Sequence, residues 1–554
     1  MRRRDISLGL FAAATASTAG AVVRQASSAQ TCTAPSPVTP YNVRDYGAVG
    51  DGCSNDHDAI QTALNLAGAT GNATVFFPRG NYFVGPTTSS LSGTLTISGN
   101  MITLYGEGWA SQVTSGITII PQGASAPAAL FTWAAAAGGT QGQFLQVQSM
   151  MFNGNSATST AGNGHCFSLS GVMGTVFANF PTFRDCYFGG FNGSGQRYDK
   201  SAIGACGIYV SFGDEVKIEN CVFQTCNQGV LIDGDAASPS AKVCVSACTF
   251  DACTTYGLQA SFVDDLLINN QTTFNQMPNG VYLGQVNETA TIDDCRFKSM
   301  SSGSAILAVG NYDVDQINIT NNYFYTVSQS VPSPVVDVGT NCQGVQITGN
   351  EFLFDYTVVN GLGIVIQNPA GFAGGAMTIL SNRFVLGGGA TLMAGVLANN
   401  ASDAINSLCI VGNYFGQAEP PGAGQSITTA IALTGSAGLV SPTVMNNTFA
   451  MSSPGSIGTA ISIGSNVTGA VLLNNSYIGG AITTPVADSG QKTVRLEAGS
   501  QTSLPSFDTL QATGGHTASF SASNKPGSSN QTGPSSWLPV VVDGATMYIP
   551  LFSS

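Results

Sequence analysis

One short pattern recurs along most of this chain: β-branched residues, then Asn or Cys, one further residue, and an aromatic residue. It reads INITNNYF at 317–324 and VQITGNEF at 345–352. Successive aromatics are separated by 23 to 36 residues. They stand at Phe152, Phe188, Phe223, Phe250, Phe274, Phe297, Phe324, Phe352, Phe384, Phe415, Phe449 and Tyr477. A repeat of this varying length is typical of a solenoid, in which each repeat forms one coil.

The residues around each aromatic predict strands rather than helices. Val216 and Ile218 precede Phe223 by seven and five residues, and this alternation by two indicates a strand with one buried face. A second short apolar run follows each repeat, such as GVLIDG at 229–234 and GVYLGQ at 280–285. Two or three short strands per coil, without helical periodicity, predict an all-β single-stranded parallel β-helix.

The position two residues before the aromatic is predicted to be structural. Asn stands there in the later repeats and Cys in several earlier ones, including Cys186, Cys221, Cys248 and Cys295. Equivalent side chains in stacked coils lie roughly 4.8 Å apart, so Asn amides can bond to one another inside the fold. We therefore expect buried stacks of Asn, Cys and Phe, rather than catalytic groups, disulfides or a zinc site.

An N-terminal cap is predicted before the coils. The segment 41–52 reads YNVRDYGAVGDG, and Asp56 then stands at the predicted N-cap of a helix. The apolar face of this helix is predicted to consist of Ala59, Ile60, Ala63, Leu64 and Ala67. The strand TVFFP follows at 74–78. The helix would cover the open end of the core, which a solenoid requires.

This segment resembles the start of the pectate-lyase superfamily domain, which includes rhamnogalacturonase- and epimerase-like proteins and phage tailspikes. The resemblance implies a right-handed parallel β-helix, export and polysaccharide substrates. It does not imply one reaction, because the superfamily includes lyases, hydrolases and binding-only proteins. The matching motif residues are predicted to fold the cap; they are Asp45, Gly47, Gly50, Asp51, Gly52 and Asp56.

Four segments are predicted. Residues 1–29 resemble a twin-arginine export signal, with Arg2 and Arg3 before an Ala/Thr-rich stretch. Residues 30–110 form the cap and first coils, and residues 111–485 form the β-helix. Residues 486–554 form a linker and a hairpin around Asp543-Gly544. The hairpin resembles those of tail-fibre-like proteins, so it would cap the solenoid or join protomers, with a homotrimer as the expected oligomer.

The charge balance restricts the partners. The chain has 17 basic and 30 acidic residues, a net charge of −13. Nucleic-acid binding requires a basic face, so it is not expected. No segment is long and apolar enough to predict a membrane span. A polyanionic ligand would need local basic residues or a bridging cation.

The candidate site is a set of acidic residues at the turn before the long strand of each coil. Aligned on the first buried residue, successive coils place four candidate catalytic residues in one row: Asp214, Asp264, Glu288 and Asp315. Neighbouring candidates for substrate binding are Asp265, Asp313, Asp233, Asp235, Tyr312, Lys217 and Arg296. Glu215 and Lys242 also flank the row.

This row allows several chemistries. Carboxylates one coil apart would be roughly 5 Å apart, and a pair of carboxylates can serve a retaining or an inverting glycosidase. The same cluster could instead bind Ca²⁺, with Lys or Arg as the base of a lyase. Asp residues also favour turns for purely structural reasons. We expect an exported polysaccharide-active hydrolase or lyase, and the alternatives are a non-catalytic glycan-binding adhesin and a uronate epimerase acting on the polymer.

Overall fold

The computed structural model describes two parts of the chain. The first is residues 40–496, except 88–92, 116–128, 135–143, 155–163, 172–177, 193–204, 236–238, 309–313, 327–332, 340–341, 356–357, 368–375, 401–404, 419–423 and 436–437. The second is residues 536–551, except 543–544. The predicted export signal lies outside these residues.

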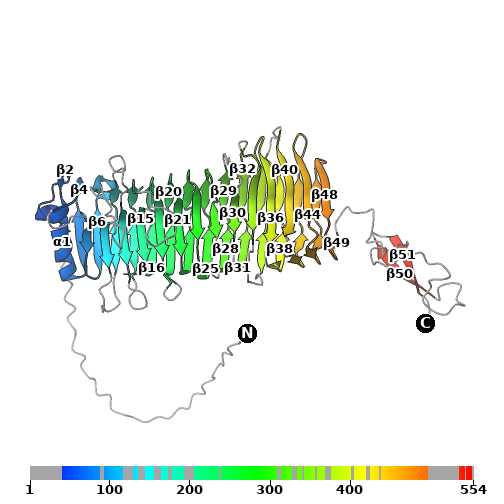
Figure 1. The fold of residues 1–554 in the computed structure, drawn as a ribbon, viewed down its shortest axis with the longest axis horizontal. Helices are drawn as coiled ribbons and strands as arrows, with labels where there is room; N and C mark the ends of the chain where they lie inside the picture. The colour runs from blue at the N-terminus through cyan, green and yellow to red at the C-terminus, as the bar shows by residue number, and fades with distance from the viewer. Residues whose placement is uncertain are drawn as a thin grey trace, which may run out of the picture. The chain divides into compact units, whose positions relative to one another are not determined.

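One coil of the first part consists of three strands in three sheets. Strand β16 (Gly213–Glu219) belongs to sheet A, β17 (Val222–Gln224) to sheet B and β18 (Gln228–Asp233) to sheet C. The next strand, β19 (Ala241–Ser246), returns to sheet A and pairs in parallel with β16. Figure 1 shows the coils stacked from the blue N-terminal end to the orange strand β49. The predicted parallel β-helix is therefore confirmed.

Within the described residues, sheet A has 17 strands, sheet B has 15 and sheet C has 14. Sheet A comprises β1 Tyr41–Asn42, β3 Ala73–Phe77, β6 Ile102–Gly106, β9 Leu145–Gln148, β12 Ala178–Asn179, β13 Pro181–Arg184, β16, β19, β22 Val263–Asn269, β25 Val286–Asp293, β28 Val314–Thr320, β31 Cys342–Thr348, β34 Met377–Leu380, β38 Leu408–Val411, β42 Thr443–Met445, β46 Val471–Leu473 and β49 Val494–Leu496.

Sheet B comprises β2 Asp51–Asn55, β4 Gly80–Val84, β7 Ser111–Ser115, β10 Met151–Asn153, β14 Tyr187–Gly189, β17, β20 Thr249–Asp251, β23 Thr273–Asn275, β26 Arg296–Lys298, β29 Tyr323–Thr326, β32 Glu351–Phe354, β35 Arg383–Leu386, β39 Tyr414–Gln417, β43 Thr448–Ala450 and β47 Ser476–Ile478. Sheet C comprises β5 Leu95–Ile97, β8 Ala129–Ala134, β11 His165–Ser170, β15 Cys206–Ser211, β18, β21 Tyr256–Ser261, β24 Asn279–Leu283, β27 Ile306–Ala308, β30 Pro334–Val338, β33 Gly361–Ile366, β36 Thr391–Asn400, β40 Ser426–Gly435, β44 Ser456–Ile463 and β48 Ile482–Asp488. Strands β37 Ile405–Asn406, β41 Leu439–Val440 and β45 Val467–Thr468 form a small parallel sheet.

The predicted internal stacks are present. The aromatic column runs through sheet B, with ring centroids 4.8 Å apart for Phe223 and Phe250 and nearly parallel planes. In the asparagine column, the Nδ2 of Asn350 donates to Asn382 Oδ1 at 2.9 Å and to the carbonyl of Ile319 at 2.9 Å. The cysteine column joins this one, because the N–H of Cys295 donates to Asn322 Oδ1. These side chains are buried and hold coils together, as predicted.

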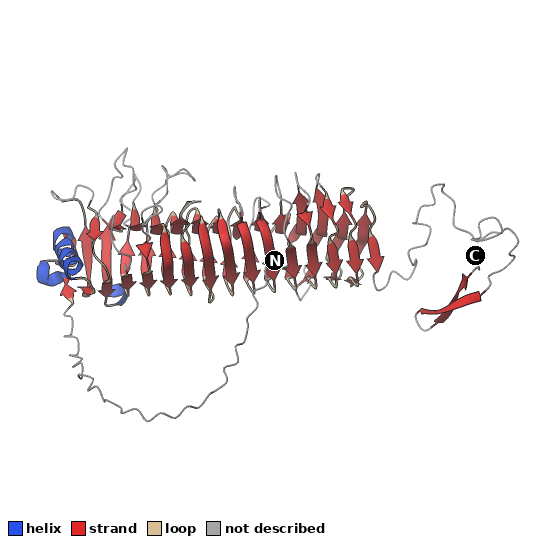
Figure 2. Cartoon of the chain, turned by 90° about the horizontal axis from the view of Figure 1, so that it is seen from below, coloured by secondary structure: helices blue, strands red, loops and turns tan. Residues whose placement is uncertain are grey.

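Helix α1 (His57–Thr70) covers the N-terminal end of the stack (Figures 1 and 2). Ile60, Ala63, Leu64 and Ala67 are buried, and Ala59 packs against them, so the predicted apolar face is confirmed. Asp56 is the N-cap residue of this helix, as predicted. The side chain of Asp56 makes no capping hydrogen bond and instead accepts from the backbone N–H groups of Val49 and Gly50.

The motif that precedes α1 folds as a tight loop. Gly47, Gly50 and Gly52 have φ values of 102°, 70° and 78°, which side chains other than glycine rarely adopt. Asp51 Oδ1 accepts from the N–H groups of Cys53 and Ser54, and these bonds lower the pKa of Asp51. The motif glycines therefore allow the turns of the cap, and the side chains of Asp51 and Asp56 accept hydrogen bonds from its backbone.

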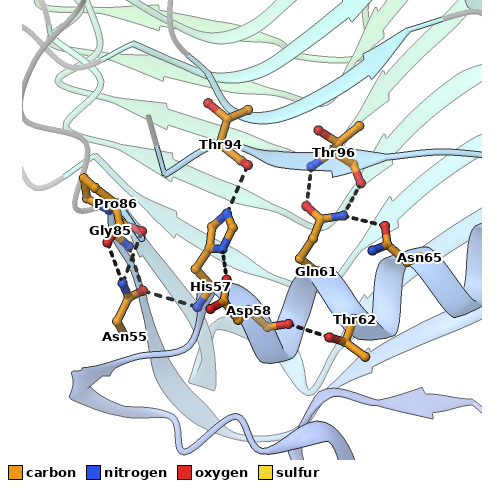
Figure 3. Close-up of polar contacts among 10 residues, drawn as sticks. All are labelled: Asn55, His57, Asp58, Gln61, Thr62, Asn65, Gly85, Pro86, Thr94 and Thr96. Carbon is orange, nitrogen blue, oxygen red and sulfur yellow. Dashed lines mark hydrogen bonds and ion pairs between the residues drawn. The ribbon is translucent and has the colours of Figure 1, made fainter. Parts of the chain in front are cut away.

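Side chains at the start of α1 clamp the segment that enters sheet C (Figure 3). The Nε2 of His57 lies 3.1 Å from the carbonyl oxygen of Thr94, and its Nδ1 lies 2.9 Å from Asp58 Oδ1. The amide of Gln61 bonds to both the N–H and the carbonyl of Thr96. The helix is thus fastened to strand β5 by polar contacts as well as by its apolar face.

The second described part is an antiparallel hairpin of β50 (Ser536–Val542) and β51 (Ala545–Leu551), as predicted. In the first part, coils continue through β48 and β49 to Leu496, beyond the predicted boundary at residue 485. Among the described residues, no helix has both the length and the hydropathy needed to cross a membrane.

Candidate functional site

The acidic candidates of sheet A share one row. Strand pairing places Asp214 opposite Ala241. Pairing of Ser240 with Val263, and of Val243 with Leu266, then places Ala241 beside Asp264.

The row continues beyond β22 with a change of register. The pairing of β22 with β25 shifts between Val263 and Asp265, because β25 has an extra residue at this point. Thr289 pairs with Gln316, so Glu288 lies beside Asp315. The side chain of Asp315 lies outside the description, as do Asp313 and Tyr312 entirely. The row of backbone positions is therefore present, although its side chains can be followed only in part.

The acidity of Asp214 is changed by its surroundings. Its side chain is half-buried, and burial is the main cause that raises its pKa. The charge of Glu215 raises this pKa further, whereas Lys242 opposes the rise. A carboxyl group with a raised pKa can hold a proton nearer to neutral pH and act as a general acid.

A groove of about 490 Å³ lies on the outer face of sheet A, next to this row. Its lining residues come from four successive coils: Glu215, Lys217, Lys242, Val243, Cys244, Asp265, Leu266, Leu267, Thr289 and Thr291. Two predicted substrate-binding residues, Lys217 and Asp265, line it. The predicted catalytic residues Asp214, Asp264 and Glu288 do not.

Glu215, Lys242 and Asp265 follow one another along the edge of this groove, one coil apart. Lys242 Nζ lies 3.6 Å from Glu215 Oε1. The two carboxylates are separated by two coils, or roughly 10 Å along the stack, with an ammonium group between them. The two carboxylates of the groove therefore lie on alternate coils, whereas the predicted carboxylates of the acidic row lie on neighbouring strands at Asp264, Glu288 and Asp315.

A second row of outward side chains forms the floor of the groove. Lys217, Cys244, Leu267 and Thr291 pair in register across four strands. Lys217 is exposed, and no described residue forms an ion pair with it. Leu267 is 36% exposed, so the floor combines an available cation with apolar surface. This combination suits a ligand that carries both an anionic group and a nonpolar face.

Comparison with known proteins bears on this site. Residues 41–305 match the family described as rhamnogalacturonase A/epimerase, pectate lyase-like. The resemblance to the pectate-lyase superfamily is confirmed. The matched region includes the cap, the groove and the first coils of this chain.

Individual relatives match over short stretches. Mannuronan C5-epimerase AlgE1 of Azotobacter vinelandii is 48% identical over 61 residues, which are 11% of this chain and 4% of that protein. Plasmin and fibronectin-binding protein A of Streptococcus pneumoniae is 49% identical over 47 residues, 8% of this chain and 6% of that protein. The crystal structure of PfbA, a surface adhesin of Streptococcus pneumoniae, aligns with a TM-score of 0.41 and 14% identity over 93% of this chain and all of that one.

Three predicted residues of the candidate site lie in other sheets or corners. Arg296 begins β26 in sheet B, beyond the far end of strand β25, so the structure does not bring it to the groove. Asp233 ends β18 in sheet C, and Asp235 follows in the corner between sheets C and A. Burial, and secondly the charge of Asp233, raise the pKa of Tyr209 to about 12.

A Ca²⁺ site is not found among the residues that the structure describes. No group of three or more His, Cys, Asp or Glu side chains in that part of the chain is arranged to hold a metal ion. Asp313 and the side chain of Asp315 lie outside it. Ca²⁺ therefore stays a prediction for the remainder of the acidic row.

Among the residues that line the groove, Lys217 and Asp265 were predicted to bind substrate, and the others were given no role in a site. Glu215 and Lys242 were predicted to flank the acidic row, and Leu267, Thr289 and Thr291 were not selected. The missed signal is the period of two along each sheet A strand. Residues two positions after the corner, such as Lys217, Cys244 and Leu267, must point outward because their neighbours Val216 and Ile218 point inward.

Proposed function

We propose that this chain is an exported polysaccharide-active enzyme that cleaves glycosidic bonds of an acidic polysaccharide in the sheet A groove. The observation that carries the proposal is the placement of Lys217 and Lys242 beside Glu215 and Asp265 in one groove. Only 8% of the residues of this chain are charged, and the net charge is −13. Two lysines in one groove of such a chain favour an anionic ligand.

The groove supports β-elimination better than hydrolysis. A glycosidase uses two carboxylates about 5–5.5 Å or about 6.5–9.5 Å apart on the two sides of the bond. Here Lys242 separates Glu215 from Asp265 and neutralises the first of them. Elimination instead needs cations that neutralise the sugar carboxylate and a base that removes the neighbouring proton.

The roles of the residues follow from their positions. Lys217 binds the sugar carboxylate, and Asp265 accepts the proton from the adjacent carbon. The electron pair of that C–H bond forms the C=C bond, and the bond to the leaving glycosidic oxygen breaks. Lys242, which forms an ion pair with Glu215, donates a proton to that oxygen.

Polymer-level uronate epimerisation is the second candidate. It begins with the same proton removal, but the proton is returned to the opposite face and no bond to oxygen breaks. The short match to a mannuronan C5-epimerase favours it. The match to plasmin and fibronectin-binding protein A favours a third outcome, binding without chemistry.

One assay separates these functions. Mature protein is incubated with pectins, alginate and bacterial exopolysaccharides, with and without EDTA. Ultraviolet absorbance of the unsaturated product and the release of reducing ends are followed together. We expect both signals to rise. Reducing ends without absorbance would indicate a hydrolase, altered sugar composition at constant polymer length would indicate an epimerase, and no change on any polymer would contradict enzymatic function.

The residue assignment is tested by Asp265→Asn and Lys217→Gln. We expect Asp265→Asn to lower kcat roughly 100-fold or more, because a positioned acid or base contributes about 10²- to 10⁴-fold. Lys217→Gln should mainly raise KM, because it removes a group that binds the substrate. Lys298→Gln, in sheet B, is the matched control and should leave both constants unchanged. Equal effects of all three variants would contradict the assignment.

A further inference from the structure

The charged edge of the groove continues toward the N-terminus as a row of apolar residues. Asn179 pairs with Asp214 and Thr182 with Lys217, so Phe180 lies beside Glu215. Pro181 pairs with Leu145, so Phe144 lies beside Phe180.

The same row reaches the first coils. Ile102 pairs with Leu145, which places Met101 beside Phe144. Ala73 pairs with Ile102, which places Asn72 beside Met101. The residues at this corner of successive coils thus form one row. Its first half, from Met101 to Phe180, is apolar, and its second half, from Glu215 to Asp265, is the charged edge described above.

The apolar half presents an aromatic surface to solvent. Phe144 and Phe180 stack with ring centroids 4.5 Å apart and an interplanar angle of 14°. Phe144 is 39% exposed and Met101 is 45% exposed. A groove of about 260 Å³ lies here, lined by Asn72, Met101, Ile102, Thr103, Phe144 and Gln146.

Folding alone does not explain these residue types. Met101 and Phe180 both have φ of 56°, a left-handed conformation that is uncommon for bulky residues. Asn72 occupies the same corner at φ 47°, and Asn tolerates this conformation better. Left-handed corners recur in this solenoid, also at Phe212 and Phe262. The exposure of the large apolar side chains of Met101 and Phe144 is therefore what indicates a role in binding.

We infer that this row is one binding track along the solenoid, in which the Met101–Phe144–Phe180 surface stacks against nonpolar sugar faces of the polysaccharide whose anionic sugar lies in the charged groove. Aromatic faces are electron-rich and attract the weakly positive C–H groups of a sugar ring. The amides of Asn72 and Gln146 provide hydrogen-bonding groups for its hydroxyls. From Met101 to Asp265 the track spans five coil spacings, or roughly 24 Å. The inference rests on the proposed function in one respect, namely that the polymer bound here is the one whose anionic sugar lies in the charged groove.

The test is Phe180→Asn, which removes the stacked ring and relieves the backbone strain. Binding to each polymer of the panel is measured by affinity electrophoresis, independently of product formation. We expect the dissociation constant for long polymer to rise roughly five- to tenfold, from the typical strength of an aromatic contact. The melting temperature should stay the same or rise. A residue with a merely structural role would not produce this combination.

Two controls test whether the loss of polymer binding comes from the ring of Phe180. Trp109→Ala removes an exposed ring that contacts Tyr187 of sheet B, and it should leave polymer binding unchanged. Fragments of the same polymer that are too short to leave the charged groove should bind wild type and Phe180→Asn equally.

Several results would overturn the inference. These are unchanged polymer binding in Phe180→Asn, an equal loss for short fragments, an equal loss in Trp109→Ala, or no binding of any polymer by the wild type. A change of oligomeric state without a change of polymer binding would instead make the aromatic surface a contact between copies. Polymer binding with the expected pattern but without product would preserve the track and contradict the proposed cleavage.

Discussion

The carboxamide of Asn382 joins three coils. Its Nδ2 donates to the carbonyl of Ile347 at 2.8 Å and to Asn413 Oδ1 at 3.0 Å. Its Oδ1 accepts from the Nδ2 and the backbone N–H of Asn350 at 2.9 and 3.0 Å. Every polar atom of this buried side chain is therefore used, which explains why Asn recurs at this position through six coils.

We predict that Asn382→Ala lowers the free energy of unfolding by about 3 kcal/mol or more, because several buried polar groups lose their partners at about 1–3 kcal/mol each. Urea unfolding followed by circular dichroism would measure the change. Asn65→Ala, on the exposed side of α1, is the control and should change stability by less than about 0.5 kcal/mol. A loss of similar size in both variants would contradict this account of the column.

Asp337, in β30, provides a prediction of pH dependence. Burial raises its pKa, and its Oδ1 has no hydrogen-bond partner among the described residues. A raised folded-state pKa means that this residue favours folding at low pH, and that this contribution is lost as the pH rises through that value. Asp337→Asn does not titrate, so it should be more stable than wild type at neutral pH and should lose this advantage in acid.

Melting temperatures of wild type and Asp337→Asn at about pH 3 and about pH 7 would measure this difference. Asp294→Asn, at an exposed corner, should follow the wild type at both values. An advantage of Asp337→Asn that is independent of pH would show that the carboxylate charge is not the cause.

At the scale of single elements, strands and helix were predictable because their signals are local. The alternation around Val216 and Ile218 follows from one buried face, and the face of α1 follows from the helical period. The aromatic and asparagine columns were predictable because each coil repeats them. The loop before α1 was only partly predictable. Asp56 was assigned to the N-cap of the helix and stands there, but the sequence does not show that its side chain bonds to Val49 and Gly50.

The site was less predictable than the strands, because it depends on the directions in which side chains point rather than on the register of the strands. Alignment of the repeats placed Asp214 and Asp264 in one row, and strand pairing gives the same order. It could not show that Glu215 and Lys242 adopt left-handed corners, with φ of 51° and 49°. Arg296 was grouped with the row because it is near in sequence, yet the corner at Cys295 turns the chain into another sheet.

At the scale of the molecule, each coil contacts mainly its two neighbours, so damage should stay local. Ile60→Asp places a charge in the buried face of α1 and should unseat this helix from the first coils. Hydrogen exchange should then become faster in β1, β3 and β5, while β38 and β42 keep their protection. Val49→Ala, at an exposed position, is the control. Uniform loss of protection along the stack would contradict this one-dimensional behaviour.

The last described coil exposes Ile478, Val494 and Leu496, which are 52%, 50% and 56% accessible. These residues lie in β47 and β49, and the described strands that pair with them are β43 and β46. This last coil pairs with the coil before it in the same parallel manner as the internal coils do. Duplication of the sequence of one coil would add one coil to the stack and leave the pairing of the existing coils unchanged. Proteins of this architecture can therefore vary in length by whole coils. In evolution, a binding track along the stack can be lengthened or shortened without changes to the existing core.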